Sequence, residues 1–161
     1  MPATDLLSIS NLLAPEVICV GLDVASKDEA IDRLVDLLDG HEAVADLDQV
    51  RADVHARERQ MSTGVGKSLA LPHARTSAVT STVAAFATTA KPLDFDAIDG
   101  EPVRLVFLLV GPDGERGRHI RLLSRISRLM NRDAFRAALL EAESPEAVLG
   151  FFRHAEDTIA A

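Results

Sequence analysis

Val103-Arg104-Leu105-Val106-Phe107-Leu108-Leu109-Val110 contains a single charged residue, Arg104, among seven apolar ones. A run of this length without alternation of polar and apolar residues is typical of a strand that is covered on both faces. Loop signals bound it, with Asp99-Gly100 before it and Gly111-Pro112-Asp113-Gly114 after it. The segment therefore predicts a central strand that needs helices on both sides of its sheet.

Helical patterns lie on both sides of this strand. Ser26 and Glu29 form a capping box before a run of apolar residues at helical spacing, which Gly40 can end. Asp46 can cap a second helix in the same way. The predicted helices cover about 27–39, 47–59, 119–130 and 133–141, and the last begins at Ser144-Pro145-Glu146. The other predicted strands cover 16–20, 69–71 and 79–87. This order predicts one α/β sandwich, a single domain over residues 1–161.

Composition narrows the class of protein: 47% of residues are apolar and 26% are charged, as in soluble globular proteins. No apolar run approaches the roughly 20 residues of a membrane-spanning helix. Met1-Pro2-Ala3-Thr4-Asp5 lacks the basic start and apolar stretch of a signal peptide. The single cysteine, Cys19, lies in an apolar run, excludes an intramolecular disulfide and is expected to be a small buried residue. We therefore expect a cytoplasmic protein without direct membrane insertion.

Charge argues against a nucleic-acid-binding protein, because the net charge is −8 and the chain has no Trp or Tyr. One local exception is a basic stripe on one side of the helix expected at 119–130. The basic stripe consists of Arg118, Arg121, Arg125, Arg128 and Arg132. A solvated outer face explains it; the alternative is a docking surface for an acidic partner.

Thr63-Gly64-Val65-Gly66-Lys67-Ser68 resembles the end of a nucleotide-binding P-loop. That loop requires a glycine five residues before Gly66, but this position is Met61. It must also open a helix, whereas Leu69-Ala70-Leu71-Pro72 follows here. Both requirements fail, so the sequence does not predict a nucleotide site.

Two histidines are the candidates for chemistry. Pro72 disfavours helical geometry for the residue before it, so the strand is expected to end at the proline with His73 at the strand end, where α/β proteins often place their sites. The alternative for His73 is a turn histidine bonded to the backbone. His119 lies on the apolar stripe of its helix and is expected to face the protein from the first turn. A core histidine with satisfied nitrogens is the alternative there.

The surroundings of these histidines separate two kinds of site. A metal pair is not expected, because no carboxylate or cysteine stands at ligand spacing. Arg57 lies near the end of the second helix, where the helix dipole favours a cation. An arginine beside a histidine is also what a phosphorylated imidazole needs, since guanidinium pairs with phosphate oxygens.

Five ordered motifs carry a family resemblance. They are Arg57-Glu58, Ser62-Thr63-Gly64-Val65-Gly66, Ala70-Leu71-Pro72-His73, Leu93-Asp94-Phe95 with Asp99-Gly100-Glu101-Pro102-Val103, and the strand at 106–109 with His119 and Leu122-Leu123. The chain resembles the fructose/mannitol-type enzyme IIA domains (EIIA type 2) of the bacterial phosphoenolpyruvate-dependent sugar phosphotransferase system, the PTS. That group includes nitrogen-regulatory IIA relatives. The resemblance covers about residues 6–152.

The resemblance implies a mixed β-sheet flanked by helices and a phosphoryl relay without cofactor or metal. His73 would accept a phosphoryl group from the phosphohistidine of the carrier protein HPr. It would then pass the group to a cysteine of a IIB domain, which serves the membrane subunit IIC. By position, His119 would orient the phosphoryl group and Arg57 would pair with its oxygens. Thr63 would lie on the loop beside the site.

Two positions depart from the family pattern. Ala74 stands where many members have glycine, and alanine would be strained if that position required a positive φ. Lys67 is larger and more charged than expected near the site. The leading hypothesis is a phosphocarrier in sugar uptake; the alternatives are a nitrogen-type regulator whose phosphorylation controls partner binding, and a non-catalytic binding module. His73, His119 and Arg57 argue against the last. Neither the sugar nor the oligomeric state can be read from the sequence.

Overall fold

The computed structural model describes residues 8–160, with side chains up to Thr158. The segment assessed above for a signal peptide and the start of the resemblance at Leu6 lie outside this range. None of the helices in the described range is long and apolar enough to cross a membrane.

A six-stranded mixed sheet forms the centre of the fold. Its path runs β1-β5-β6-β3-β2, and β4 also pairs with β6. The strands are β1 (Ile18–Leu22), β2 (Gly64–Gly66), β3 (Leu69–Ala70), β4 (His73–Thr76), β5 (Val83–Leu93) and β6 (Val103–Pro112). β6 pairs antiparallel with β5 and parallel with β3 and β4. It is buried from Leu105 to Gly111, so the predicted central strand is confirmed.

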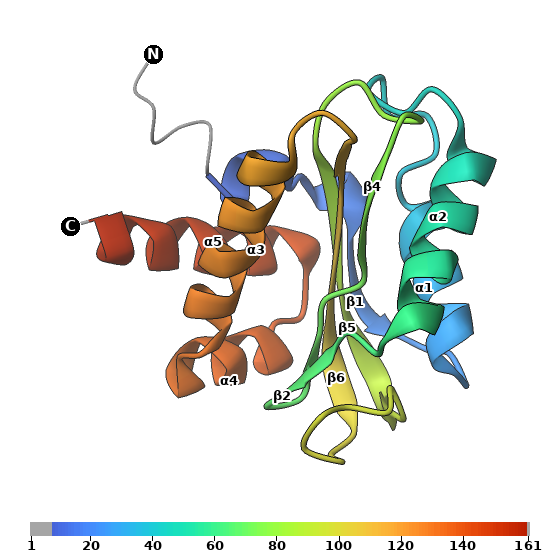
Figure 1. The fold of residues 1–161 in the computed structure, drawn as a ribbon. Helices are drawn as coiled ribbons and strands as arrows, with labels where there is room; N and C mark the ends of the chain where they lie inside the picture. The colour runs from blue at the N-terminus through green and yellow to red at the C-terminus, as the bar shows by residue number, and fades with distance from the viewer. Residues whose placement is uncertain (1–7, 161) are drawn as a thin grey trace.

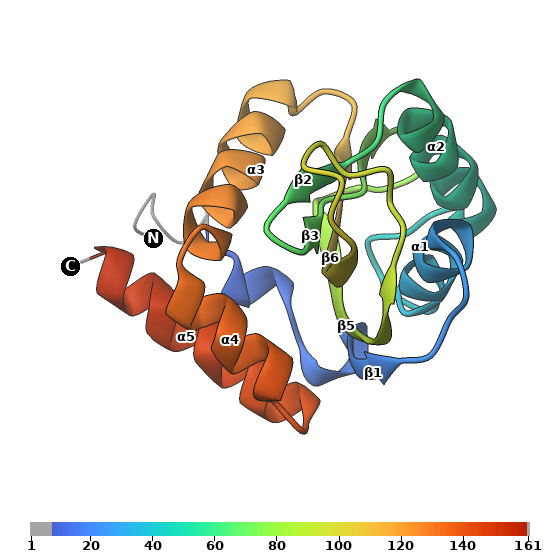
Figure 2. The same ribbon diagram turned by 90° about the horizontal axis from the view of Figure 1, so that it is seen from below.

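Helices cover both faces of this sheet (Figures 1 and 2). The helices are α1 (Lys27–Asp36), α2 (Leu47–Gln60), α3 (Arg116–Met130), α4 (Asp133–Glu141) and α5 (Pro145–Ala160), with two 3₁₀ turns, η2 (Ser10–Leu12) and η3 (Pro15–Val17). The pair α1 and α2 lies on one face, while α3, α4 and α5 lie on the other. The predicted α/β sandwich is therefore confirmed.

Phenylalanines fill the core between the sheet and α5. Phe86 of β5 and Phe107 of β6 lie at register partners and contact Phe152 of α5, with ring centroids 5.4 and 5.9 Å from its own. Phe135 of α4 lies edge-on to the same ring at 5.1 Å. Tilted arrangements of this kind are favoured by the charge distribution of aromatic rings. They attach the C-terminal helices to the sheet.

The predicted helix starts are confirmed at their caps. Ser26 Oγ accepts the amide of Glu29, and Asp46 Oδ1 accepts the amide of Gln49. Ser144 Oγ accepts the amide of Ala147. One predicted helix end differs. The first helix ends at Asp36, and Gly40 instead ends the turn that follows, with φ of 82°.

The limits of two strands differ from prediction. The strand expected at 79–87 is β5 at Val83–Leu93, and Val79 makes only an isolated bridge to Val44. The Thr80 amide donates to the Ala43 carbonyl in the loop between α1 and α2, which takes this residue away from the sheet. The first strand likewise begins at Ile18 rather than 16, because Pro15–Val17 forms a 3₁₀ turn. Apolar content alone did not separate these turns from the strands.

The P-loop look-alike is a β-hairpin. Gly64–Gly66 forms β2, and Lys67 and Ser68 make the two-residue turn into β3 with φ of 55° and 68°. Positive φ at both positions is the pattern of a type I′ turn. The Lys67 Nζ contacts Asn131 at the end of α3, about 18 Å along that helix from His119 at 1.5 Å per residue. The rejection of a P-loop is confirmed, and Lys67 lies away from the histidines.

The structure also shows the backbone conformation of Ala74 and the burial of Cys19. Ala74 lies inside β4 and is not among the residues with positive φ, so glycine's freedom is not needed there. Cys19 is half-buried in β1 rather than fully buried, and burial raises the pKa of its thiol.

Candidate functional site

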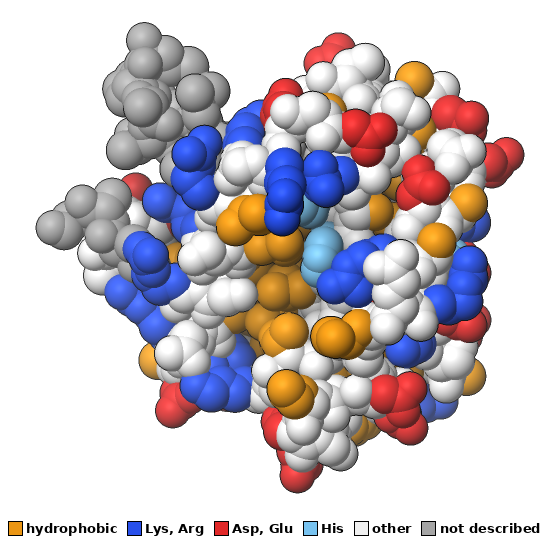
Figure 3. All heavy atoms as spheres, viewed as in Figure 1, with side chains coloured by type: hydrophobic (Ala, Val, Ile, Leu, Met, Phe, Trp, Pro, Cys, Tyr) orange, Lys and Arg blue, Asp and Glu red, His pale blue; other side chains and the backbone are white. Residues whose placement is uncertain are grey.

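A cleft of about 700 Å³ opens between α2, β4 and the first turns of α3. Its lining includes His73, His119 and three arginines, Arg57, Arg75 and Arg116. Figure 3 shows histidine side chains in a hollow of the surface with Lys and Arg side chains around them. The two predicted histidines therefore share one cleft, and its edge carries positive charge in a protein whose net charge is −8.

His73 begins β4 and pairs in register with Leu109 of β6. The prediction that a strand continues to Pro72 and ends there is wrong, because β3 stops at Ala70 and a new strand starts at the histidine. Proline lacks an amide hydrogen and interrupts the pairing, although the Pro72 carbonyl still accepts the amide of Leu109. The Nδ1 of His73 lies 2.7 Å from the carbonyl oxygen of Leu71. A backbone bond thus sets the orientation of this half-buried ring.

His119 is the fourth residue of α3, which starts at Arg116, three residues earlier than predicted. Its side chain faces the protein as expected and is 5% exposed. Neither ring nitrogen has a hydrogen-bond partner within the described part of the chain. Within the described residues no protein group satisfies this histidine, which the alternative of a core histidine with satisfied nitrogens would require. The ring centroid lies 5.6 Å from that of His73, with the planes tilted by 50°.

Gly111 makes room for the His119 ring. A Cβ at this position would lie 3.0 Å from Nδ1 of His119 and 3.4 Å from Oγ1 of Thr82. The glycine follows the central run of β6, where its missing side chain permits this close approach. The end of the central strand thus shapes the seat of the second histidine.

Both imidazoles are held neutral. Burial lowers the pKa of His73, and the positive charge of Arg57 lowers it further, while its bond to Leu71 and the charge of Glu58 oppose this. Burial lowers the pKa of His119 to about 4, helped by His73 and by the charge of Arg75. At about pH 7 each ring therefore has one N–H and one free lone pair.

Arg57 and Thr63 occupy different places in the site. Arg57 lies in the last turn of α2 and lines the cleft, and its Nη1 donates to the Met61 carbonyl at 3.1 Å. Thr63 is only 3% exposed and does not line the cleft. Its amide and hydroxyl both donate to the carboxylate of Glu58. Thr63 is therefore close to the site in the chain but turned into the protein.

Sequence reasoning missed Arg75 and Arg116 as members of the cleft. Arg75 follows His73 by two residues on β4, and residues two apart on a strand point to the same face. That signal was available once His73 was placed inside a strand rather than at its end. Arg75 donates to the Asp113 carbonyl at 3.0 Å. Arg116, as the first residue of α3, could be found only from the true start of that helix.

The basic stripe is only partly free for docking. Arg125 Nε donates to the buried Glu156 at 3.1 Å, and Arg118 pairs with Glu115 at 3.3 Å. Both side chains are half-buried, whereas Arg121, Arg128 and Arg132 are exposed. A docking role for the stripe stays a prediction.

Among the described residues no group of three or more His, Cys, Asp or Glu side chains could hold a metal ion.

The fold and the cleft define a class of protein: an α/β domain with a mixed sheet that presents an oriented, neutral histidine to a cleft lined by arginines. The family model of the phosphoenolpyruvate-dependent sugar phosphotransferase system, EIIA 2, matches residues 11–155. The chain belongs to this family, and it is a phosphotransfer component of that system.

Named relatives agree with this assignment. The fructose-specific EIIABC component of Bacillus subtilis is 34% identical over 89% of this chain, which spans only 22% of that longer protein. The fructose-specific EIIA component of Haloferax volcanii is 37% identical, with 89% of this chain and 94% of the relative covered. The crystal structure of the nitrogen regulatory protein IIA-Ntr from Neisseria meningitidis superposes with a TM-score of 0.84 at 32% identity, over 89% of this chain and 98% of that one.

Proposed function

We propose that the protein is a phosphocarrier in which His73 accepts a phosphoryl group from the phosphohistidine of HPr and passes it to the cysteine of a IIB domain. One observation carries the proposal: His73 is anchored through Nδ1 in an arginine-lined cleft, with the unpaired ring of His119 at 5.6 Å between centroids. The fructose-specific relatives support a role in uptake of a sugar of the fructose/mannitol type.

The tautomer of His73 supports Nε2 as the nucleophilic atom. A carbonyl oxygen can only accept, so the short contact to Leu71 requires the hydrogen on Nδ1. The lone pair of the neutral ring is then on Nε2. This atom forms a new N–P bond as the N–P bond of the donor phosphohistidine breaks. In the second step the Nε2–P bond breaks while an S–P bond forms on the acceptor cysteine. The lowered pKa of His73 keeps this lone pair available at neutral pH.

Arg57 and Arg75 supply the charge that the transferring group needs. Each donates to a backbone carbonyl, and within the described residues neither forms an ion pair with a carboxylate. Although Asp53 and Asp113 also line the cleft, both guanidinium groups are free of ion pairs in the described residues and can pair with phosphoryl oxygens there. Neutral His119 would donate its one N–H to a phosphoryl oxygen, which gives its unpaired nitrogen a partner. Removing one such donor typically costs about 3 kcal/mol of transition-state stabilisation.

A regulatory role is the second candidate. The superposition with the Neisseria meningitidis nitrogen regulatory protein supports a protein whose phosphorylation state controls the binding of partners. For the transport role, the Escherichia coli mannitol IIA enzyme, which shares this fold with a TM-score of 0.75, has been solved in complex with its phosphorylated IIB enzyme. In either role His73 is the phosphorylated residue. A non-catalytic binding module would not be phosphorylated.

The test of the acceptor is a mass measurement. The protein is incubated with phosphoenolpyruvate, enzyme I and HPr, and its intact mass is recorded. We expect an acid-labile gain of about 80 Da, the mass of one phosphoryl group, that His73→Ala abolishes. A His73→Ala protein that still gained this mass would overturn the assignment of the acceptor, and an unmodified wild-type protein would favour the binding module.

Transport and regulation are separated by the next step. The phosphorylated protein is mixed with each IIB domain encoded in the same genome, and transfer to cysteine is followed over time. Rapid transfer to a cognate IIB supports transport, whereas normal loading from HPr without transfer to any IIB supports regulation.

Arg57→Ala tests charge compensation: we expect an unchanged thermal midpoint and transfer slowed by about a hundredfold. Unchanged transfer with lower stability would make Arg57 structural.

A further inference from the structure

Glu58 is a buried carboxylate that the proposed chemistry does not use. It lies in the last turn of α2 and is 4% exposed. A negative charge near a helix C-terminus is opposed by the helix dipole. Burial adds the cost of removing the carboxylate from water, which only close hydrogen-bond partners can offset. The position is therefore unfavourable unless the surrounding contacts stabilise the charge.

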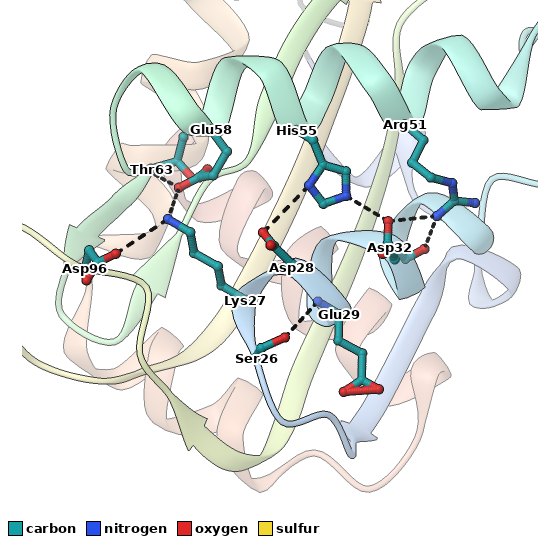
Figure 4. Close-up of polar contacts among 10 residues, drawn as sticks. All are labelled: Ser26, Lys27, Asp28, Glu29, Asp32, Arg51, His55, Glu58, Thr63 and Asp96. Carbon is teal, nitrogen blue, oxygen red and sulfur yellow. Dashed lines mark hydrogen bonds and ion pairs between the residues drawn. The ribbon is translucent and has the colours of Figure 1, made fainter.

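Three donors surround this carboxylate (Figure 4). The Thr63 amide donates to Oε2 at 2.9 Å and the Thr63 hydroxyl donates to Oε1 at 2.5 Å. The Nζ of Lys27, from the start of α1, lies 3.2 Å from Oε2. Glu58 thus holds both the backbone and the side chain of Thr63, the residue that leads into β2.

Thr63 connects this network to the nucleophile through two further bonds. Its carbonyl accepts the amide of Leu71 at 2.9 Å. The Leu71 carbonyl in turn accepts Nδ1–H of His73 at 2.7 Å. The peptide that orients the imidazole is therefore tied, through Thr63, to a buried charge on α2. Every link of this connection is at hydrogen-bond distance.

We propose that Glu58 is a positioning residue for His73: by holding Thr63 at its amide and its hydroxyl, it places the Leu71 carbonyl that selects the Nδ1–H tautomer. The inference rests on the proposed role of His73 as phosphoryl acceptor. Glu58 does not line the cleft in which the phosphoryl group would lie. It explains why Thr63 is buried beside the site. The charge of Glu58 also opposes the lowering of the His73 pKa.

The test compares two buried carboxylates. Glu58→Ala is paired with the control Glu156→Ala, because Glu156 is 6% exposed and also accepts several hydrogen bonds, but between α5 and the N-terminal turn. Three quantities are measured: the thermal midpoint, the ¹⁵N NMR shifts and pKa of the His73 ring, and the rate of phosphoryl acceptance from HPr. The NMR readout needs no phosphoryl transfer. A wild-type protein that is not phosphorylated would therefore refute the proposed function without obscuring the position of the ring.

We expect both variants to lose thermal stability and only Glu58→Ala to change the site. In that variant the His73 ring should show a mixture of Nδ1–H and Nε2–H tautomers, and transfer should slow by about tenfold or more. Glu156→Ala should keep the wild-type tautomer and a rate within about twofold. Glu58→Gln, which keeps an acceptor for the Thr63 amide, should restore most of the rate. Wild-type tautomer and rate in Glu58→Ala, or equal slowing in Glu156→Ala, would overturn the proposal.

A second pair decides the question if Glu58→Ala does not fold. Thr63→Val removes the hydroxyl donor at nearly the same volume, and Thr63→Ser retains it. We expect Thr63→Val to slow transfer and mix the His73 tautomers, and Thr63→Ser to remain close to wild type. Equal rates and equal tautomers in these two proteins would contradict the connection from Glu58 to His73.

Discussion

Burial of neutral His119 makes the stability of this protein depend on pH in a measurable way. The pKa of the imidazole falls from 6.5 to about 4 on folding, because burial penalises its charged form. Both the folded and the unfolded protein carry a neutral ring above 6.5, so the stability is fully present there. As the pH falls from 6.5 toward 4, the unfolded chain binds a proton that the folded protein resists, and stability is lost.

The size of the effect follows from the same shift. Each unit of pKa difference corresponds to about 1.4 kcal/mol. The change from 6.5 to about 4 therefore lowers the free energy of unfolding by about 3 kcal/mol once the pH is below 4. At about pH 5 the loss is already about 2 kcal/mol. This loss is a large part of the typical free energy of unfolding of a domain, which is roughly 5–15 kcal/mol.

The perturbation is His119→Gln, which keeps a hydrogen-bonding side chain of similar volume but cannot be protonated. Urea unfolding of both proteins is measured at about pH 7, 6 and 5. We expect the wild-type protein to lose about 2 kcal/mol more than the variant between about pH 7 and 5. His73 and the carboxylates with lowered pKa, such as Asp32 and Glu156, are present in both proteins. Their contributions largely cancel in the difference. Parallel curves would refute the conclusion that His119 is buried and neutral.

Three further predictions concern single side chains. Gly111→Ala places a Cβ 3.0 Å from Nδ1 of His119, so the ring must move and phosphoryl transfer should slow by about tenfold at unchanged secondary structure; an unchanged rate would show that the ring position is not critical. Lys67→Asn should raise the free energy of unfolding by about 0.5 kcal/mol, because asparagine adopts positive φ more readily; a lower free energy of unfolding, measured with urea, would contradict backbone strain at Lys67. Arg75→Gln should slow transfer and shorten the lifetime of the isolated phosphoprotein by about tenfold, whereas the exposed control Arg121→Gln should change neither. Equal effects of the two substitutions would show that Arg75 acts only through the overall positive charge and not through contact with the phosphoryl group.

Local patterns accounted for much of the architecture. The apolar run at 103–110 predicted a central strand, and β6 is buried because both faces of the sheet are covered. The caps at Ser26 and Asp46 predicted two helix starts. These signals are readable because a cap or a helical stripe depends on residues within a few positions of one another. Strand-end and helix positions singled out the two histidines and Arg57, and the family motifs assigned their expected roles.

Tertiary structure decided how those candidates meet. His73 and His119 share a cleft only because β4 pairs in register with β6 and α3 packs back over the end of that strand. No local pattern contains this register, since hydrogen bonds between strands join residues far apart in the chain. The same holds for the neutrality of His119, because its pKa depends on burial and on neighbouring charges from other elements.

Glu58 most plainly shows the difference between what the sequence determines and what the tertiary structure decides. From the sequence it is one acidic residue in a charged segment at the end of a helix, where solvent exposure is the ordinary outcome. The packing of α1 against α2 and the entry into β2 bury it and bring it donors from Lys27 and Thr63. A helix-end signal acts over one turn of chain, whereas desolvation and hydrogen bonding of a carboxylate depend on every element that surrounds it. Only the folded protein therefore distinguishes this glutamate from its exposed neighbours.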